Sequence, residues 1–175
     1  HRVYRRQRQM GIGDRQSLAR SLVGGRQPVQ RRARAKYTLS ISCHAMDLRH
    51  AIYPILVGHY EGDPIAGAEA QIDRTLVKGG LNQRYHMGMY AGKPGTTTVA
   101  LPKPSEEQIQ AGIQHGAVVI GLGHYGDLTA GRLGEAVRDG VLRYLLHLVD
   151  IEGGRLPEEM RPREVRLATL LLGYN

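Results

Sequence analysis

The stretch "AVVIGLGHYGDLTAGRL", residues 117–133, decides the fold, because an apolar segment here passes through glycines into a long periodic segment. Residues 117–123 are typical of a buried strand, and apolar residues at helical spacing predict a helix from Thr129 to Val149. Between the two lies Gly121-Leu122-Gly123-His124-Tyr125-Gly126, which matches the G-x-G-x-x-G of dinucleotide-binding turns. The glycines therefore either cradle a phosphate or let the strand reach the helix.

The context of this glycine string favours a junction over a phosphate site. In a dinucleotide-binding turn the helix begins within the glycines, so that its amides face the pyrophosphate. Here the helix is expected to begin only at Thr129, and Asp127 stands in the gap, where its charge would repel an anion. The acidic residue that should close a second strand is also missing, because a long helix occupies that region. Nucleotide or ADP-ribose binding remains the alternative.

A second phrase repeats the first. "GHYEGD" at 58–63 and "GHYGD" at 123–127 are nearly identical, and each is predicted to join a strand to a helix. Open α/β sheets bind ligands at the carboxyl ends of their strands, so one crevice could use both loops. Asp63 and Asp127 are expected to cap the following helices. The alternative is that both loops only share turn chemistry. The candidate ligand-binding residues are His59, Tyr60, Gly121, Gly123, His124 and Tyr125.

The rest of the chain completes an α/β pattern. Further strands are expected at 37–46, 51–58, 96–102 and 165–173, a helix at 63–79, and a short helical or irregular piece at 81–90. Ser105 begins either a solvated loop or a helix. This order predicts an α/β fold with a mixed sheet flanked by helices.

Cys43 is the only cysteine, which excludes an internal disulfide and a cysteine-rich zinc site. Neighbouring residues of a strand point to opposite faces, so Cys43 and His44 cannot pair with each other. We expect a buried structural cysteine; the alternative is a peptidase nucleophile served by His59 or His124. The histidines lack the spacing of a metal site, and no apolar run reaches the ~20 residues of a membrane span. We expect no catalytic residue, cofactor or metal, no membrane contact and a cytoplasmic location.

The positive charge of the chain is concentrated at its beginning. Residues 1–36 contain eleven Arg and Lys against the single acidic residue Asp14, while the remainder is close to neutral. This composition predicts an irregular basic arm at 1–36, followed by a folded domain at 37–175 that belongs to a longer polypeptide. The arm either contacts nucleic acid or an acidic surface, or is a solvated linker. Its candidate contact residues are Arg5, Arg6, Arg8, Arg31, Arg32, Arg34 and Lys36.

Three phrases also carry a family resemblance: "YPILVGHYEGDPIAGAEAQIDRTLVKGGLNQ" at 53–83, "YAGKPGTTTVALP" at 90–102 and "AVVIGLGHYGDLTAGRLGEAVRDGVLRYL" at 117–145. In order and spacing, over about residues 50–150, the chain resembles the N-terminal domain of leucyl (cytosol) aminopeptidases. The matching positions are Asp73, Gly80, Leu81, Gly92, Lys93, Gly95, Gly121, Leu122, Gly123, Leu133 and Ala136.

This resemblance implies a fold similar to the macro domain, in which the glycines of "GLG" serve packing. The family's catalysis resides in a separate two-metal domain, marked by a lysine-and-aspartate loop and an "NTDAEGRL"-like stretch, and nothing in this chain resembles either. The resemblance therefore implies a non-catalytic binding, scaffolding or regulatory domain. Its implied partners are other domains of the same polypeptide, partner chains or further copies of itself, with DNA binding known in some bacterial members. Similar domains occur in large bacterial proteins with caspase-like (CHAT) modules.

Overall fold

The computed structural model describes residues 38–151 and 164–172. The chain divides into two units, residues 1–43 and residues 44–175, whereas composition had suggested a boundary after residue 36. In the second unit the elements follow in the order 3-10 helix η1 (Leu48–His50), β1 (Ile55–Tyr60), α2 (Gly67–Thr75), α3 (Gly80–His86), β2 (Thr97–Ala100), α4 (Glu106–Gln110), β3 (Ala117–Gly123), α5 (Ala130–Ile151) and β4 (Ala168–Thr169).

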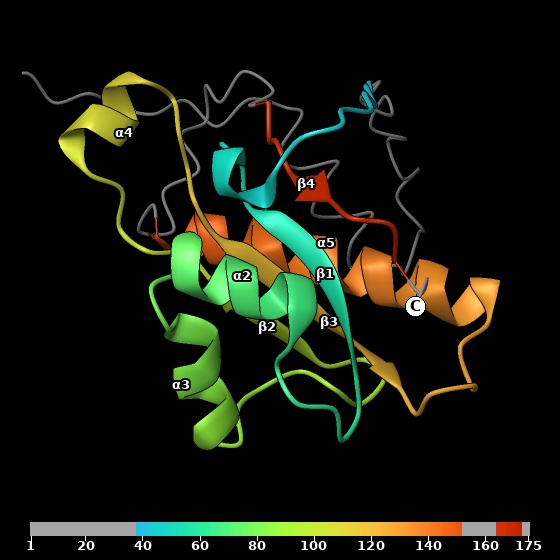
Figure 1. Cartoon of the computed structure of the whole chain (residues 1–175). Helices are drawn as coiled ribbons and strands as arrows, with labels where there is room; N and C mark the ends of the chain where they lie inside the picture. The colour runs from blue at the N-terminus through green and yellow to red at the C-terminus, as the bar shows by residue number, and fades with distance from the viewer. Residues whose placement is uncertain (1–37, 152–163, 173–175) are drawn as a thin grey trace, which may run out of the picture. The chain divides into compact units, whose positions relative to one another are not determined.

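The strands of this second unit form one mixed sheet in the order β2-β3-β1-β4. Strand β3 is antiparallel to β2 and parallel to β1, and β4 is parallel to β1. Helices α2 and α3 cover one face of the sheet and α5 covers the other (Figure 1). The predicted α/β class, with a mixed sheet flanked by helices, is therefore confirmed. Because β3 is central and covered on both faces, all seven of its residues are buried.

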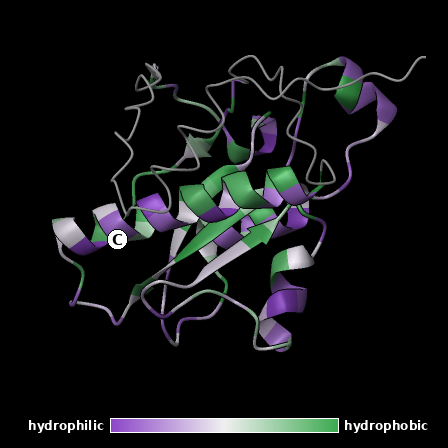
Figure 2. Cartoon of the chain, turned by 180° about the vertical axis from the view of Figure 1, so that it is seen from behind, coloured by the Kyte–Doolittle hydropathy of each residue, from purple (hydrophilic) through white to green (hydrophobic). Residues whose placement is uncertain are grey.

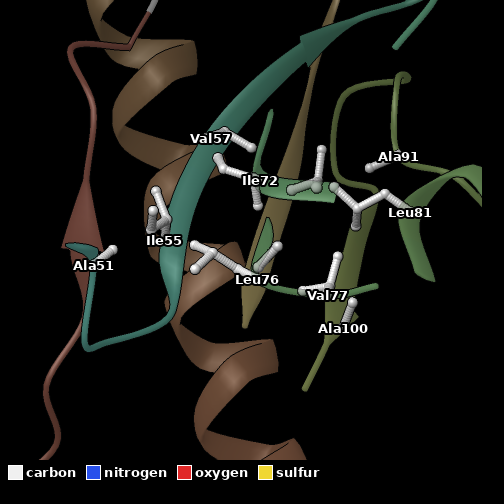
Figure 3. Packing of buried hydrophobic residues seen from close by; sticks show 11 residues of the cluster. Ala51, Ile55, Val57, Ile72, Leu76, Val77, Leu81, Ala91 and Ala100 are labelled. Atoms are coloured by element: carbon white, nitrogen blue, oxygen red, sulfur yellow. The ribbon is translucent and has the colours of Figure 1, made fainter. Parts of the chain in front are cut away.

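Two apolar clusters hold these layers together, one on each face of the sheet. On the α2 side, Ile55 and Val57 of β1 pack with Ile72, Leu76 and Leu81 (Figure 3). On the α5 side, the alternate residues of β1 and β3 pack with the inner face of α5; the buried members are Leu56, Tyr60, Val118, Ile120, Leu122 and Tyr144. Both faces of β1 are thus apolar, which explains why its sequence does not alternate.

The strand predicted at 37–46 is wrong for the residues described. Residues 38–47 form no strand, and the side chains of Leu39 and Ile41 are 85% and 82% exposed. Cys43 is also exposed, so the expected buried structural cysteine is wrong as well. Alternation gives a segment one apolar side, but a strand also needs a hydrogen-bonding neighbour. No described strand pairs with this segment.

The helix predicted at 63–79 is shorter, and Asp63 does not cap it. Residues 63–66 precede the helix, and its N-cap is Ala66. Gly67 has a left-handed φ of 52°, which prevents a continuous helix from Asp63. The helix ends at Thr75. Gly79, whose backbone is left-handed, is the N-cap of α3, and α3 lies where the sequence predicted a short helical or irregular piece at 81–90.

Side chains elsewhere supply the helix caps. Helix α3 has no cap from Gly79; instead the buried Asp73 carboxylate accepts hydrogen bonds from the Leu81 N–H at 2.7 Å and from Asn82 at 2.5 Å. Ser105 caps α4 through a capping box, so the helix start suggested there is confirmed. Thr129, rather than Asp127, accepts from the amide of Arg132 at the start of α5.

The remaining predicted elements are present with shifted bounds. Strand β1 begins after Pro54 and continues through His59 and Tyr60, which places these two residues in the strand rather than in a loop. Of the strand predicted at 165–173, the described residues 165–172 contain only the short β4 (Ala168–Thr169). Because β4 pairs only with Ile55 and Leu56, no described strand lies beside the rest of β1 on that side, where the site described next is found.

Candidate binding site at the open edge of the sheet

The two repeated phrases end neighbouring parallel strands. His59 of β1 lies beside Gly121 of β3, and Tyr60 lies beside Gly123 across a local irregularity in the register. The carboxyl ends of β1 and β3 therefore lie side by side at one end of the sheet (Figure 1). Ligands of open α/β sheets are commonly bound at such an end.

His59 lies in a buried polar cluster. Its side chain is 5% exposed, and its Nδ1 lies 2.9 Å from Oε2 and 3.1 Å from Oε1 of Glu69, in the first turn of α2. The His59 ring also meets the Tyr90 ring edge-on, with 4.8 Å between centroids. With Nδ1 held by the carboxylate, Nε2 is the ring nitrogen left for another group, and it has no hydrogen-bond partner among the described residues.

Tyr90 completes this cluster. Its hydroxyl donates a hydrogen bond to Oε2 of Glu69 at 3.1 Å. Burial, and then the charge and hydrogen bond of Glu69, raise the pKa of Tyr90 above its ordinary value of 10.0. Glu69 thus accepts hydrogen from a phenol and an imidazole at once, which fixes the orientation of both rings.

Tyr60, Tyr125 and His124 lie in different surroundings from His59. The Tyr60 ring points to the α5 side and meets the exposed Tyr125 ring, with 5.4 Å between centroids. His124 is 72% exposed, and its Nε2 lies 3.7 Å from Oε2 of Glu61. The structure therefore brings Tyr60 and Tyr125 together, but it buries one histidine of the repeated phrases and exposes the other.

Gly121 and Gly123 use their amides within the fold. The Gly121 N–H donates to the carbonyl of Thr96 at 3.0 Å, and the Gly123 N–H donates to the carbonyl of Gly92 at 2.8 Å. A Cβ at Gly121 would lie 2.1 Å from the carbonyl oxygen of Lys93, so only glycine lets the turn at 92–95 pack here. These two amides have no hydrogen left for a phosphate, although nucleotide binding elsewhere in the loops stays an untested prediction.

A hollow of about 410 Å³ opens where β4 ends beside β1. One side consists of residues 63–64 and 66–69, with the carboxylates of Asp63 and Glu69. The apolar part of the lining consists of Leu122 and residues 170–172. The floor is β1 itself, from Val57 to Tyr60, so His59 and Tyr60 both line the hollow.

Strand β1 is paired with β3 along this floor, but on its β4 side no described strand lies beside Gly58. The Ile55 and Glu61 amides donate to β3 and its following loop, whereas the Pro54 carbonyl accepts from Ala168 of β4. Because main-chain groups of successive strand residues alternate between two sides, the N–H and C=O of Gly58 face the β4 side. Strand β4 pairs only with Ile55 and Leu56, so no described strand reaches Gly58 there.

Three further predictions concern metal, membrane and nucleic-acid contacts. Within residues 38–151 and 164–172, no group of three or more His, Cys, Asp and Glu side chains could hold a metal ion. None of the helices described is long and apolar enough to cross a membrane. Arg5, Arg6, Arg8, Arg31, Arg32, Arg34 and Lys36, the candidate nucleic-acid contacts, lie outside the described residues.

Sequence reasoning missed Glu69, Tyr90 and the open edge at Gly58. Glu69 has the spacing of an ordinary acidic residue in a first helical turn, where it complements the helix dipole. Counting alternate residues from Ile55 would have placed His59 on the face beneath α2, and hence near that turn. The open edge exists because β4 ends at Thr169. Nothing in the leucine run at 170–172 indicates that the strand ends before it.

Two comparisons with known proteins do not assign the chain to a family. No protein-family model matches the chain, and a search of curated proteins finds no match for it either.

Proposed function

We propose that this chain is a non-catalytic binding or scaffolding domain of a larger bacterial protein, acting in the cytoplasm through protein–protein contacts. The similarity to the aminopeptidase N-terminal domain supports this assignment. The observation that carries it is an apolar row on the outer side of α5, the side turned away from the sheet.

Helix α5 has apolar residues on two sides. The inner side packs on the sheet through Tyr144 and its neighbours. Farther along the helix, Leu142, Leu145 and Leu146 are 53%, 37% and 53% exposed, and the half-buried Val149 continues the same row. The C-terminal half of α5 is accordingly mostly green in Figure 2. An amphipathic helix that only covered a sheet would be polar on this side.

The spacing of this row suits contact with a second copy of the same helix. Residues 142, 145, 146 and 149 follow the i, i+3, i+4, i+7 pattern of a helix–helix seam. In an antiparallel pair related by a two-fold axis, Leu142 would face Val149, and Leu145 would face Leu146. Such a self-complementary patch is what a symmetric dimer uses. We therefore propose a second copy as the first partner of this surface.

Light scattering on the purified chain, alone in solution, tests this proposal. We expect the wild-type mass to rise from monomer toward dimer with concentration, and the double variant Leu142→Glu, Leu146→Glu to remain a monomer, because two buried charges would oppose the contact. Arg143→Glu, on the same helix and exposed but outside the row, is the matched control and should behave as wild type. A wild-type chain that stays monomeric up to about 1 mM would contradict the proposal.

The basic arm supports a second candidate, a nucleic-acid-associated function. Eleven positive charges against one negative charge in residues 1–36 would neutralise phosphates and release counterions. This candidate depends on sequence composition, and its salt dependence is the property to measure.

A further inference from the structure

We propose that the hollow beside β1 binds an extended peptide segment of a partner protein that carries a Lys or Arg side chain, with the peptide main chain pairing to Gly58. This site is separate from the outer row of α5 and does not depend on it. Three features of the hollow lead to this ligand, namely its open strand edge, its set of acceptors and its leucines.

The open edge favours a main chain. Gly58 presents an N–H and a C=O on the β4 side, and no hydrogen bond joins either group to another described residue. An extended peptide offers the complementary C=O and N–H at strand spacing, as in recognition by strand addition. The peptide would lie beside β1 on the β4 side, beyond the point where β4 ends at Thr169.

The polar side of the hollow offers acceptors. Asp63 is exposed and its carboxylate has no ion-pair or hydrogen-bond partner among the described residues. His59 is 95% buried, and when its Nδ1–H donates to Glu69 the neutral ring leaves Nε2 as an acceptor that has no partner among the described residues. Nε2 also keeps contact with solvent, since no described side-chain nitrogen or oxygen is both fully buried and unpaired. Lysine and arginine have only donors, so they match this set in hydrogen bonding and in charge.

The opposite side of the hollow suits an apolar neighbour. Leu122 and Leu172 belong to the cluster on the α5 side, and Leu171, which also lines the hollow, is 88% exposed. Successive side chains of a strand point to opposite faces. A peptide that pairs with Gly58 would therefore turn alternate residues toward Asp63 and toward the leucines, which selects for alternating basic and apolar residues.

The test is calorimetry of the whole chain with the blocked peptide Ac-Val-Lys-Val-Lys-Val-NH2. We expect saturable binding. The glutamate counterpart, Ac-Val-Glu-Val-Glu-Val-NH2, should not bind, because carboxylates would face Asp63. A lysine peptide methylated on its central main-chain nitrogens should also fail to bind, because it lacks the donors that pair with the edge. Equal heats for the lysine and the methylated peptides, or no heat from the lysine peptide, would overturn the proposal.

The two repeated phrases, at 58–63 and 123–127, provide a matched pair of variants. Asp63→Asn should weaken binding of the lysine peptide by roughly fivefold, the effect of one exposed ion pair. Asp127→Asn removes the equivalent aspartate of the other phrase, outside the hollow, and should leave the affinity unchanged. Both residues are exposed, so both variants should fold. Equal effects of the two substitutions would indicate a general charge effect and overturn the site.

Amide hydrogen exchange locates the contact and separates it from the α5 surface. The Gly58 amide should become protected when the lysine peptide is added, and the double variant Leu142→Glu, Leu146→Glu should bind the peptide as wild type does. Failure of one proposal therefore leaves the other standing. A dimer that survives that double variant and dissociates on adding peptide would make a second copy the occupant, and would overturn the assignment to a partner peptide.

Discussion

At the scale of single residues, the most informative group is Glu69, because it organises the polar side of the hollow. It accepts hydrogen bonds from Tyr90 and His59 while only 12% exposed. A buried carboxylate is tolerated only when its oxygens are satisfied, and two ring donors satisfy them here. The pair of rings is thereby held in one orientation, which prepares His59 Nε2 for a ligand before any ligand arrives.

Because of Tyr90, the free energy of unfolding should depend on pH. Its pKa in the folded protein is raised above 10.0 by burial and by Glu69, so the folded state holds this proton more tightly than the unfolded chain. The corresponding stability is complete below pH 10 and is lost as the pH rises above it. We expect the free energy of unfolding in urea to fall as the pH rises above about 10 in wild type, and to fall less steeply in Tyr90→Phe.

Tyr125→Phe is the control for this titration, because the Tyr125 side chain is 74% exposed and lies outside the cluster around Glu69. Its pH dependence should follow wild type. If Tyr90→Phe also follows wild type over the same range, Tyr90 does not carry the alkaline transition, and the hydrogen bond to Glu69 is not formed in solution.

At the scale of elements, α5 shows how one residue type takes opposite roles along one helix. A Cβ at Gly140 would lie 2.4 Å from Cγ2 of the buried Ile120, whereas a Cβ at Gly134 would meet open space. Gly140 therefore permits the close approach of α5 to β3, and Gly134 has no such contact. Only the packing distinguishes the two positions.

Substituting alanine at each glycine should change stability in opposite directions. Gly140→Ala should destabilise the fold by about 1–3 kcal/mol, because Ile120 must move within a full core. Gly134→Ala should stabilise it by about 0.5–1 kcal/mol, since alanine is the better helix former. Urea unfolding measures both, and the same sign for the two changes would show that α5 does not pack on β3 as described.

At the scale of the whole chain, the separation of charge allows a direct test of the basic arm. If the seven candidate cations between Arg5 and Lys36 each neutralise one phosphate, the affinity for duplex DNA should fall with salt at a log–log slope of roughly −6. A chain that begins at residue 37 should lose this binding, while a chain with α5 altered by Leu142→Glu should keep it. Fluorescence anisotropy across a salt series gives the slope. Binding that is absent at low salt, or that persists without the arm, removes the nucleic-acid candidate.

Local patterns were sufficient for much of the second unit. The continuous apolar run at 117–123 became β3 with the predicted bounds, and the period of the following helix placed α5 within two residues. Each repeated phrase was expected to follow a strand, and they stand at the ends of the neighbouring strands β1 and β3, although only the first phrase lines the hollow. Local patterns did not predict contacts between separate elements. An example is the hydrogen bond by which Asp73 of α2 caps α3.

By itself the sequence determined the α/β class, the central strand and its helix, and the place of each repeated phrase at the end of a strand, because these follow from hydrophobic period. Only the tertiary structure decided that 38–47 forms no strand, that His59 turns inward to Glu69, and that β4 ends at Thr169. Each of these depends on whether a hydrogen-bonding neighbour lies within reach. A neighbour from a distant part of the chain leaves no trace in the local spacing of residues.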